Sequence, residues 1–404
     1  MTCCSNGPRR RGLGWWLVGA LVALLGAGVY ALSFFIQIDV PYYEREAGRY
    51  FGRPVHIGAA SFTLAPLPSV SFSDVTIGAG EVRIASARAA MDMDMVWTSD
   101  RHFKLIELQG VTVPDARILP ALFGSAESAN VGFDRILATD VRIATPFAKL
   151  PPFSVKADVD RSRRLSRIEM QDRASSFYVT LTAAGAGRES VEIQSASFAV
   201  PFGAPFMLTD FGARGELTRT GLTLSGFDAR LFGGVIKGTA QLNFTGPWTL
   251  NGKLEAKVLE LSSAAPQIFS GGRANGTASF SMTAAGPGEL FGAPVLQGNF
   301  DVSPSTVTLI DLGQSLDTRQ EVAAGTTQLD GTSGEIQIAG RQIRIRNVLM
   351  TAGKTTALGN FDVDASRGAL GGRMAIEAPG VDGPRRAGFS FAGTVDRPVL
   401  KRTN

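Results

Sequence analysis

The chain has 404 residues, of which 47 are glycine and 44% are hydrophobic, and its formal net charge is +4. This composition is typical of a folded, turn-rich protein and excludes a disordered one. Basic residues are mixed with acidic ones along the chain, whereas nucleic-acid-binding proteins gather them on one element, so we expect no nucleic acid among the partners. Cys3 and Cys4 are the two cysteines, so residues after them form no disulfide scaffold and hold no cysteine nucleophile.

Residues 12–38 form an uncharged, mostly apolar run that follows Arg9, Arg10 and Arg11. A helix rises about 1.5 Å per residue, and about 20 apolar residues span a bilayer core, so the run predicts one transmembrane helix. The arginines favour a cytoplasmic location for residues 1–11. We therefore expect a single-pass protein of the bacterial inner membrane with its bulk in the periplasm. A cleaved signal peptide is the alternative, but its apolar core runs only about 7 to 15 residues.

Residues 39–52 predict a short amphipathic helix that links the membrane segment to the rest of the chain. Pro41 suits a first helical turn, the stretch EREAGRY contains helix-forming residues, and Gly52 can end the helix.

Residues 53–404 predict a β-rich periplasmic domain, because apolar and polar residues alternate over short stretches that end in turn residues. One face of each strand is then dry and the other wet, as antiparallel sheets allow. Helices are expected only near residues 120–127 and 262–269, which argues against a parallel α/β fold. The clearest apolar strand positions are Met91, Met93, Met95 and Trp97; Phe177, Val179 and Leu181; Leu254, Ala256 and Val258; Ala278, Phe280 and Met282; and Ile336, Ile338, Ile343 and Ile345.

The sequence offers no catalytic constellation, and we expect no catalytic residue, cofactor or bound metal. His56 and His102 each stand alone, without a cysteine nearby to share a zinc ion. The pairs Asp92 with Asp94 and Asp362 with Asp364 share a strand face and have the oxygen ligands that cations prefer, but solvated strands commonly carry such pairs.

Four stretches resemble AsmA-like proteins: residues 52–78, 103–118, 233–266 and 334–372. The resemblance covers about half of the chain and rests on the order of the membrane helix, short helix and strands more than on any one motif. It implies a periplasmic antiparallel β-sheet curled into an elongated hydrophobic groove, akin to the repeating β-groove and chorein-type lipid-transfer proteins. Larger members of the family are implicated in phospholipid movement and envelope integrity.

The resemblance implies that apolar strand faces line such a groove and that the partners are phospholipid, the inner membrane and envelope proteins. A groove of about twenty strands would be on the order of 100 Å long, which is short for bridging an envelope unaided. A closed core would instead suit an envelope scaffold or an outer-membrane protein assembly factor, and a hydrolase is a third, disfavoured alternative. The candidate groove residues are Met91, Met93, Met95, Val179, Leu181, Leu254, Ala256 and Val258.

Overall fold

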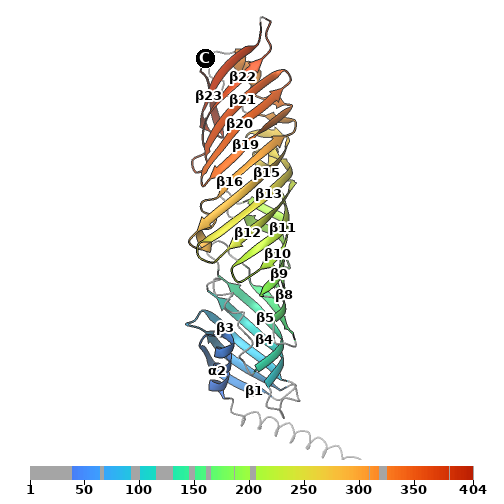
Figure 1. Cartoon of the computed structure of the whole chain (residues 1–404), viewed down its shortest axis with the longest axis vertical. Helices are drawn as coiled ribbons and strands as arrows, with labels where there is room; N and C mark the ends of the chain where they lie inside the picture. The colour runs from blue at the N-terminus through green and yellow to red at the C-terminus, as the bar shows by residue number, and fades with distance from the viewer. Residues whose placement is uncertain are drawn as a thin grey trace, which may run out of the picture. The chain divides into compact units, whose positions relative to one another are not determined.

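The described chain is mostly β, with 72% of it in strands and only a few short helices (Figure 1). It divides into two compact units: residues 1–144 with 150–168 form unit 1, and residues 145–149 with 169–404 form unit 2. The computed structural model describes residues 39–63, 68–91, 101–114, 131–144, 151–160, 165–185, 187–200, 206–308, 310–317, 325–381 and 383–403.

Two expected helices, at residues 12–38 and 120–127, lie outside the described residues. Within the described ranges, no helix has the length and apolar character needed to cross a bilayer. The membrane anchor therefore stays a prediction.

The short helix expected after residue 39 is α2, Val40–Phe51. The Asp39 side chain accepts a hydrogen bond from the Tyr42 backbone N–H at 3.2 Å and so caps the first turn. Gly52 follows the last turn with a φ of 62°, a left-handed conformation that glycine adopts without strain.

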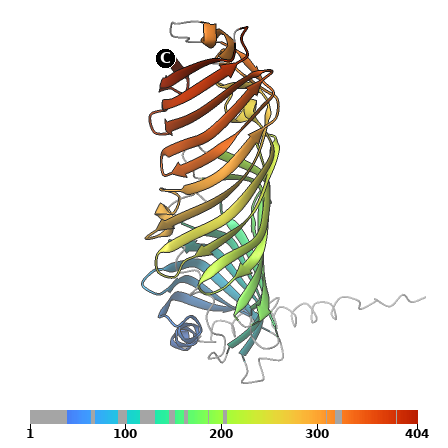
Figure 2. The same cartoon turned by 45° about the horizontal axis from the view of Figure 1, so that its top comes forward.

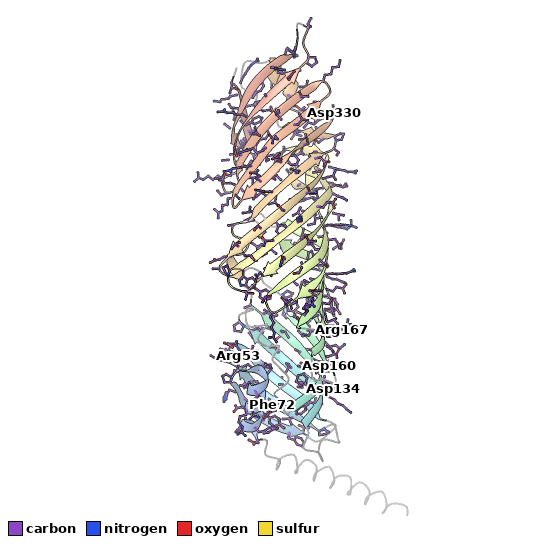
Figure 3. All side chains as sticks on the ribbon, in the orientation of Figure 1. Arg53, Phe72, Asp134, Asp160, Arg167 and Asp330 are labelled. Carbon is purple, nitrogen blue, oxygen red and sulfur yellow. The ribbon has the colours of Figure 1, made fainter. Side chains whose placement is uncertain are left out.

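Unit 1 packs α2 beside a small sheet. Tyr43 lies edge-on to Phe72 with ring centroids 5.2 Å apart, and Figure 3 shows Phe72 beside the helix. The Glu44 carboxylate accepts a hydrogen bond from the Ile57 backbone N–H at 2.8 Å, which satisfies a donor of the first strand. Neighbouring apolar side chains are almost fully buried, so this part of unit 1 is a closed core: Val55, Ile57, Val75, Ile77, Val82 and Ile84.

The sheet of unit 1 is antiparallel except where β4 pairs with β5 in parallel. Its strands are β1 (Val55–Thr63), β2 (Ser69–Ile77), β3 (Val82–Met91), β4 (Arg101–Val113), β5 (Val131–Ile143) and β6 (Phe153–Val159).

Unit 2 forms an antiparallel sheet in which successive strands pair, except that β13 pairs with β15 and β16 pairs with β19 (Figure 1). The strand β7 (Leu165–Asp172) lies at the division between the units in the sequence. The paired strands are β8 (Phe177–Gly185), β9 (Arg188–Val200), β10 (Phe206–Leu217), β11 (Gly221–Leu231), β12 (Gly234–Asn243), β13 (Trp248–Glu260), β15 (Arg273–Ala284), β16 (Val295–Val302), β19 (Gly331–Ala339), β20 (Gln342–Ala352), β21 (Thr355–Asp364), β22 (Ala369–Ala378), β23 (Arg385–Thr394) and β24 (Arg397–Arg402).

A separate three-stranded sheet and short helices complete unit 2. The small strands are β14 (Phe269–Gly271), β17 (Ser305–Val307) and β18 (Thr327–Leu329), and the helices are α4 (Leu261–Ala264), η4 (Pro287–Glu289) and α5 (Leu312–Asp317). The helix expected at residues 262–269 is wrong in extent, because α4 ends at Ala264. Pro266 disfavours helical geometry at Ala265, which has a ψ of 70°, and Phe269 already begins β14.

The turn before β8 depends on Asp172, which is buried. Its Oδ1 accepts hydrogen bonds from the backbone N–H groups of Ser176 at 2.6 Å and Phe177 at 2.9 Å, and its Oδ2 accepts one from the Ser176 hydroxyl at 2.6 Å. Burial alone would raise the pKa of Asp172, but these hydrogen bonds outweigh it and hold the pKa below the ordinary value of 3.8.

We expect Asp172→Ala to lower the free energy of unfolding by about 1 to 3 kcal/mol at pH 7, because it leaves buried donors unsatisfied. A carboxylate whose pKa is lowered by folding stabilises the fold at pH values above its ordinary pKa. This contribution disappears as the pH falls through the lowered pKa. Urea unfolding at pH 7 and at pH 3 or below should therefore show the wild-type advantage shrinking in acid. An advantage that stays constant with pH would contradict the role of the ionised carboxylate.

Candidate functional site

The candidate site is one face of the unit 2 sheet. Residues paired across antiparallel strands have their side chains on the same face, so the strand register defines rows of neighbours. One row crosses every paired strand from β8 to β24 and contains only apolar residues and glycine. This first apolar row is Val179, Ile193, Ala213, Phe227, Gly238, Leu254, Ala278, Gly298, Ile336, Ile345, Phe361, Gly372, Phe391 and Leu400.

Two further rows lie beside the first on the same face, two residues away along the strands, or three where a register shift separates Leu224 from Phe227. The second apolar row is Leu181, Val191, Gly215, Leu224, Ala240, Gly252, Phe280, Leu296, Ile338, Ile343, Val363 and Leu370. The third is Ala229, Ile236, Ala256, Gly276, Phe300 and Gly334. We call the face that carries these rows the apolar face.

The opposite face, which we call the polar face, carries hydrophilic residues between the same strands. One of its rows is Thr239, Lys253, Ser279, Gln297, Gln337, Arg344 and Asp362. The sheet thus has a wet side and a continuous apolar side, as the alternation in the sequence predicts.

The apolar face is only partly covered over its middle strands. The large side chains of the three rows between β11 and β20 are half-buried: Leu224, Phe227, Leu254, Phe280, Leu296, Phe300, Ile336, Ile338, Ile343 and Ile345. In a close-packed core, side chains of this size contact neighbours on all sides. These side chains therefore keep apolar surface that another molecule can cover.

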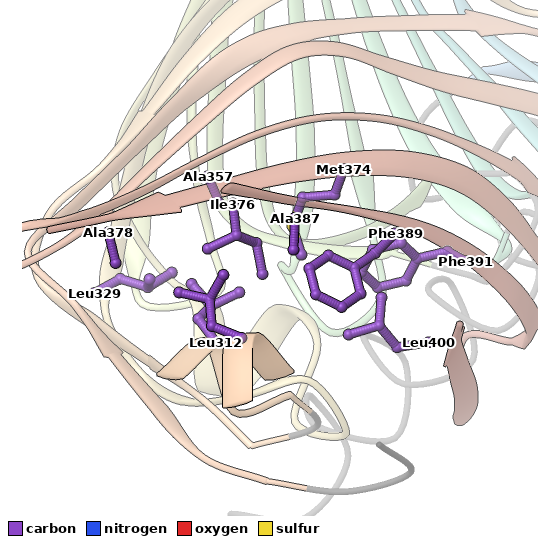
Figure 4. Close-up of a cluster of buried hydrophobic side chains, with 11 residues drawn as sticks. Leu312, Leu329, Ala357, Met374, Ile376, Ala378, Ala387, Phe389, Phe391 and Leu400 are labelled. Atoms are coloured by element: carbon purple, nitrogen blue, oxygen red, sulfur yellow. The ribbon is translucent and has the colours of Figure 1, made fainter. Parts of the chain in front are cut away.

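The end of the face at β21–β24 differs, because the chain itself covers it. Leu312 and Leu316 of α5, 4% and 8% exposed, pack with Leu329 of β18 against the sheet. The strands arch over this cluster, and α5 lies on its other side (Figure 4). Phe361 and Phe391, both members of the first apolar row, meet there edge to face with centroids 5.0 Å apart. The remaining buried members are Ala357, Met374, Ile376, Ala378, Ala387, Phe389 and Leu400.

Phenylalanine rings lie directly over glycines of the neighbouring strand at several places on the apolar face, of which Gly238 and Gly252 show the shortest distances. A Cβ atom on Gly238 would lie 2.6 Å from Cζ of Phe227, and one on Gly252 would lie 2.3 Å from Cζ of Phe280. The strands also approach closely there, since the Cβ on Gly252 would lie 2.3 Å from the Thr239 carbonyl oxygen. Glycine thus allows a close backbone approach within the curved strands of unit 2 (Figure 2).

We expect Gly252→Ala to lower the free energy of unfolding by about 1 to 3 kcal/mol, because a carbonyl oxygen of the sheet cannot move aside as a flexible side chain would. Gly226 is the matched control: it is also within a strand, but its Cβ would have open space around it. Gly226→Ala should be neutral or stabilising by up to about 1 kcal/mol. Equal effects of the two substitutions in urea unfolding would argue against the close packing at Gly252.

Hollows of about 750 Å³ and 640 Å³ lie behind the apolar face rather than on it. The larger of the two is lined by the residues before and after Ala240, Gly252 and Phe280 in their strands. Because side chains alternate along a strand, these lining residues are on the polar face. The residues that line them include hydroxyl, amide and lysine side chains, and neither hollow belongs to the apolar face. A third hollow, of about 860 Å³, includes Arg214, Asp228 and Lys237 and is likewise polar.

Four of the candidate residues lie on the apolar face. Val179 and Leu254 are in the first row, Leu181 is in the second, and Ala256 is in the third, where it is buried. Met91 is the last residue of β3, and its side chain is not described. Met93 and Met95 lie outside the described residues.

The prediction for Val258 is wrong. A β-bulge interrupts the register between Ala256 and Leu259, and Val258 has a φ of 58° with its side chain 46% exposed. The Asn275 side chain accepts a hydrogen bond from the Val258 backbone N–H at 3.0 Å and holds the bulge in place. Because the bulge adds a residue, the alternation shifts, and Leu259 pairs with Ala274 instead.

The alternation in the sequence identifies strands but misses the glycines and single phenylalanines of the rows. Gly238, Gly252 and Gly298 lie within strands, whereas a glycine in a sequence more commonly indicates a turn. Phe227 is missed for a related reason, because a register shift between Leu224 and Phe227 breaks the period of two. Only the pairing of strands shows that these residues join one surface.

Three of the titratable groups singled out from the sequence take part in ordinary surface contacts. Asp92 and Asp94 lie outside the described residues, and the side chain of His102 is not described. Nδ1 of His56 lies 3.1 Å from the Glu44 carboxylate, and Asp362 pairs with Arg346. Hydrogen bonds from the hydroxyl and the backbone N–H of Ser366 lower the pKa of Asp364. The described residues contain no group of three or more possible metal ligands.

No family model, curated protein or solved structure matches the chain. The apolar face is therefore the feature of the molecule that bears most directly on its function.

Proposed function

We propose that this protein is a non-enzymatic, inner-membrane-anchored periplasmic protein that binds or conducts phospholipid on the apolar face of its curled β-sheet, in support of envelope biogenesis. The observation that carries the proposal is the set of half-buried apolar rows on β11–β20. The resemblance to AsmA-like proteins supports the same function.

The hydrophobic effect explains how such rows hold a lipid and still let it move. Apolar surface removed from water gains about 25 cal/mol per Å² without any directional requirement. A continuous apolar row therefore offers an acyl chain similar binding at successive positions, while the headgroup stays in water.

The dimensions of the first apolar row suit several lipids in series. Strands lie about 4.8 Å apart, so a row from β8 to β24 runs for about 60 Å. Two opposed acyl chains span about 30 Å of bilayer core, or about 15 Å each, so the row is about four chain lengths long.

The test is lipid analysis of the full chain after detergent extraction and size-exclusion chromatography. We expect phospholipid at more than one molecule per chain, above the amount bound by the same chain with the charge-bearing substitution Ile338→Glu. The variant retains the predicted membrane anchor, so the comparison removes lipid that is bound there. Equal lipid content in the two proteins would overturn the proposal.

The closed cluster beneath α5 favours the alternative, an envelope scaffold or outer-membrane protein assembly factor, because a fully packed face offers no lining. That observation applies to β21–β24, whereas the middle strands leave large apolar side chains only partly buried. We therefore prefer the lipid-binding function.

A further inference from the structure

The short helix α5 occupies the apolar face where the first row ends. Phe361, Phe391 and Leu400 of that row lie in or against the cluster that α5 completes. On the middle strands the corresponding row members, such as Leu254 and Ile336, remain half-exposed. The side chains of α5 thus take the place that a ligand would take elsewhere on the face.

The helix α5 depends on tertiary contacts. It has 6 residues, and helices shorter than about 12 residues are marginal without tertiary support. Its buried side chains are Leu312, Ser315 and Leu316. One hydrogen bond joins it to β18, from the Leu312 backbone N–H to the Thr327 hydroxyl at 3.0 Å, and one joins it to β24, from Nη1 of Arg402 to the Leu316 carbonyl oxygen at 3.2 Å.

An acyl chain can replace the apolar contacts of α5. Burial of the two leucines is non-directional, so an alkyl chain of similar apolar area satisfies the same surface. Release of the Leu316 carbonyl would free the Arg402 guanidinium, whose planar donors suit a phosphate oxygen. The surface beneath α5 therefore combines apolar side chains with the Arg402 guanidinium at its edge.

We propose that the apolar surface of β22–β24 beneath α5 is a second acyl-chain site, with the chemical class of a phospholipid, and that α5 is the displaceable cover of that site. This inference rests on the proposed function, since it assigns a further binding site to the end of the same apolar face. Because α5 and the lipid would cover the same surface, they cannot occupy this site at the same time.

Hydrogen exchange of the α5 amides tests the proposal. The full chain, held in amphipathic-polymer particles, is mixed with vesicles of phosphatidylethanolamine and phosphatidylglycerol, and bound lipid is counted in parallel. We expect exchange within Leu312–Asp317 to accelerate at least tenfold as lipid binds, while the amides of β22 and β23 stay protected. Bound lipid with unchanged exchange in α5 would overturn the proposal.

The variant Arg402→Met weakens one tie of α5 without adding charge to the apolar face. It should show the same acceleration at a lower lipid concentration, and an unchanged lipid dependence would count against displacement. If the wild-type chain binds no lipid at all, the lipid count shows that the proposed function has failed, and the second site fails with it. If the wild-type chain binds lipid that Ile338→Glu loses, but hydrogen exchange in α5 does not change, only the second site is overturned.

Discussion

Replacing Ile338 by glutamate is expected to weaken lipid capture on the middle strands while the protein remains folded. Ile338 lies in the second apolar row between Leu296 and Ile343, and its side chain is half-buried. In the free protein a glutamate there can keep its carboxylate in water, so the sheet can still form. Against an acyl chain, the same carboxylate would have to lose its hydration or its charge, which costs several kcal/mol. We therefore expect bound phospholipid to fall at least about tenfold, which corresponds to about 1.4 kcal/mol.

Val258→Glu is the matched control, because it adds the same charge to the same sheet at an exposed residue in the bulge, outside the three apolar rows. Lipid content and folded yield should match those of the wild type. The measurement is lipid per folded chain, with circular dichroism and urea unfolding beside it. A closed core would give the opposite pattern for Ile338→Glu, namely a loss of folding by several kcal/mol, in line with an unpaired buried charge.

Local sequence pattern predicts much of this fold where each strand behaves independently. Ile336, Ile338, Ile343 and Ile345 alternate with polar residues, and all four lie on the apolar face. The helix α2 was predictable for a similar reason, since Pro41 in its first turn and Gly52 after its last turn are local signals.

Features that depend on distant residues escape such a reading. The bulge at Val258 is held by Asn275 from the next paired strand, so the alternation in residues 253–258 continues one residue too far. The closure of the face by α5 also depends on contacts between Leu316 and strands that follow much later in the chain. A pattern of alternation shows that a face is apolar but not what covers it.

Phe391→Ala is expected to lower the free energy of unfolding by about 3 to 5 kcal/mol, the range for truncation of a buried phenylalanine. Phe391 is 5% exposed in the cluster beneath α5 and loses both its packing there and its edge-to-face contact with Phe361. Few neighbouring groups can collapse into the space, because β22, β24 and α5 surround it. The substitution therefore combines the loss of apolar burial with a residual cavity.

Phe280→Ala provides the comparison, since it removes the same side chain from the same face at a half-buried position on β15. Its ring covers Gly252 on one side, while its other side faces the partly exposed middle of the apolar face. We expect roughly half the loss seen for Phe391→Ala, because less area leaves water when this ring is buried. Urea unfolding of both variants measures the difference. Equal losses near 4 kcal/mol would mean that the middle of the face is packed as tightly as its end, and the lipid-binding surface would then be confined to whatever α5 uncovers.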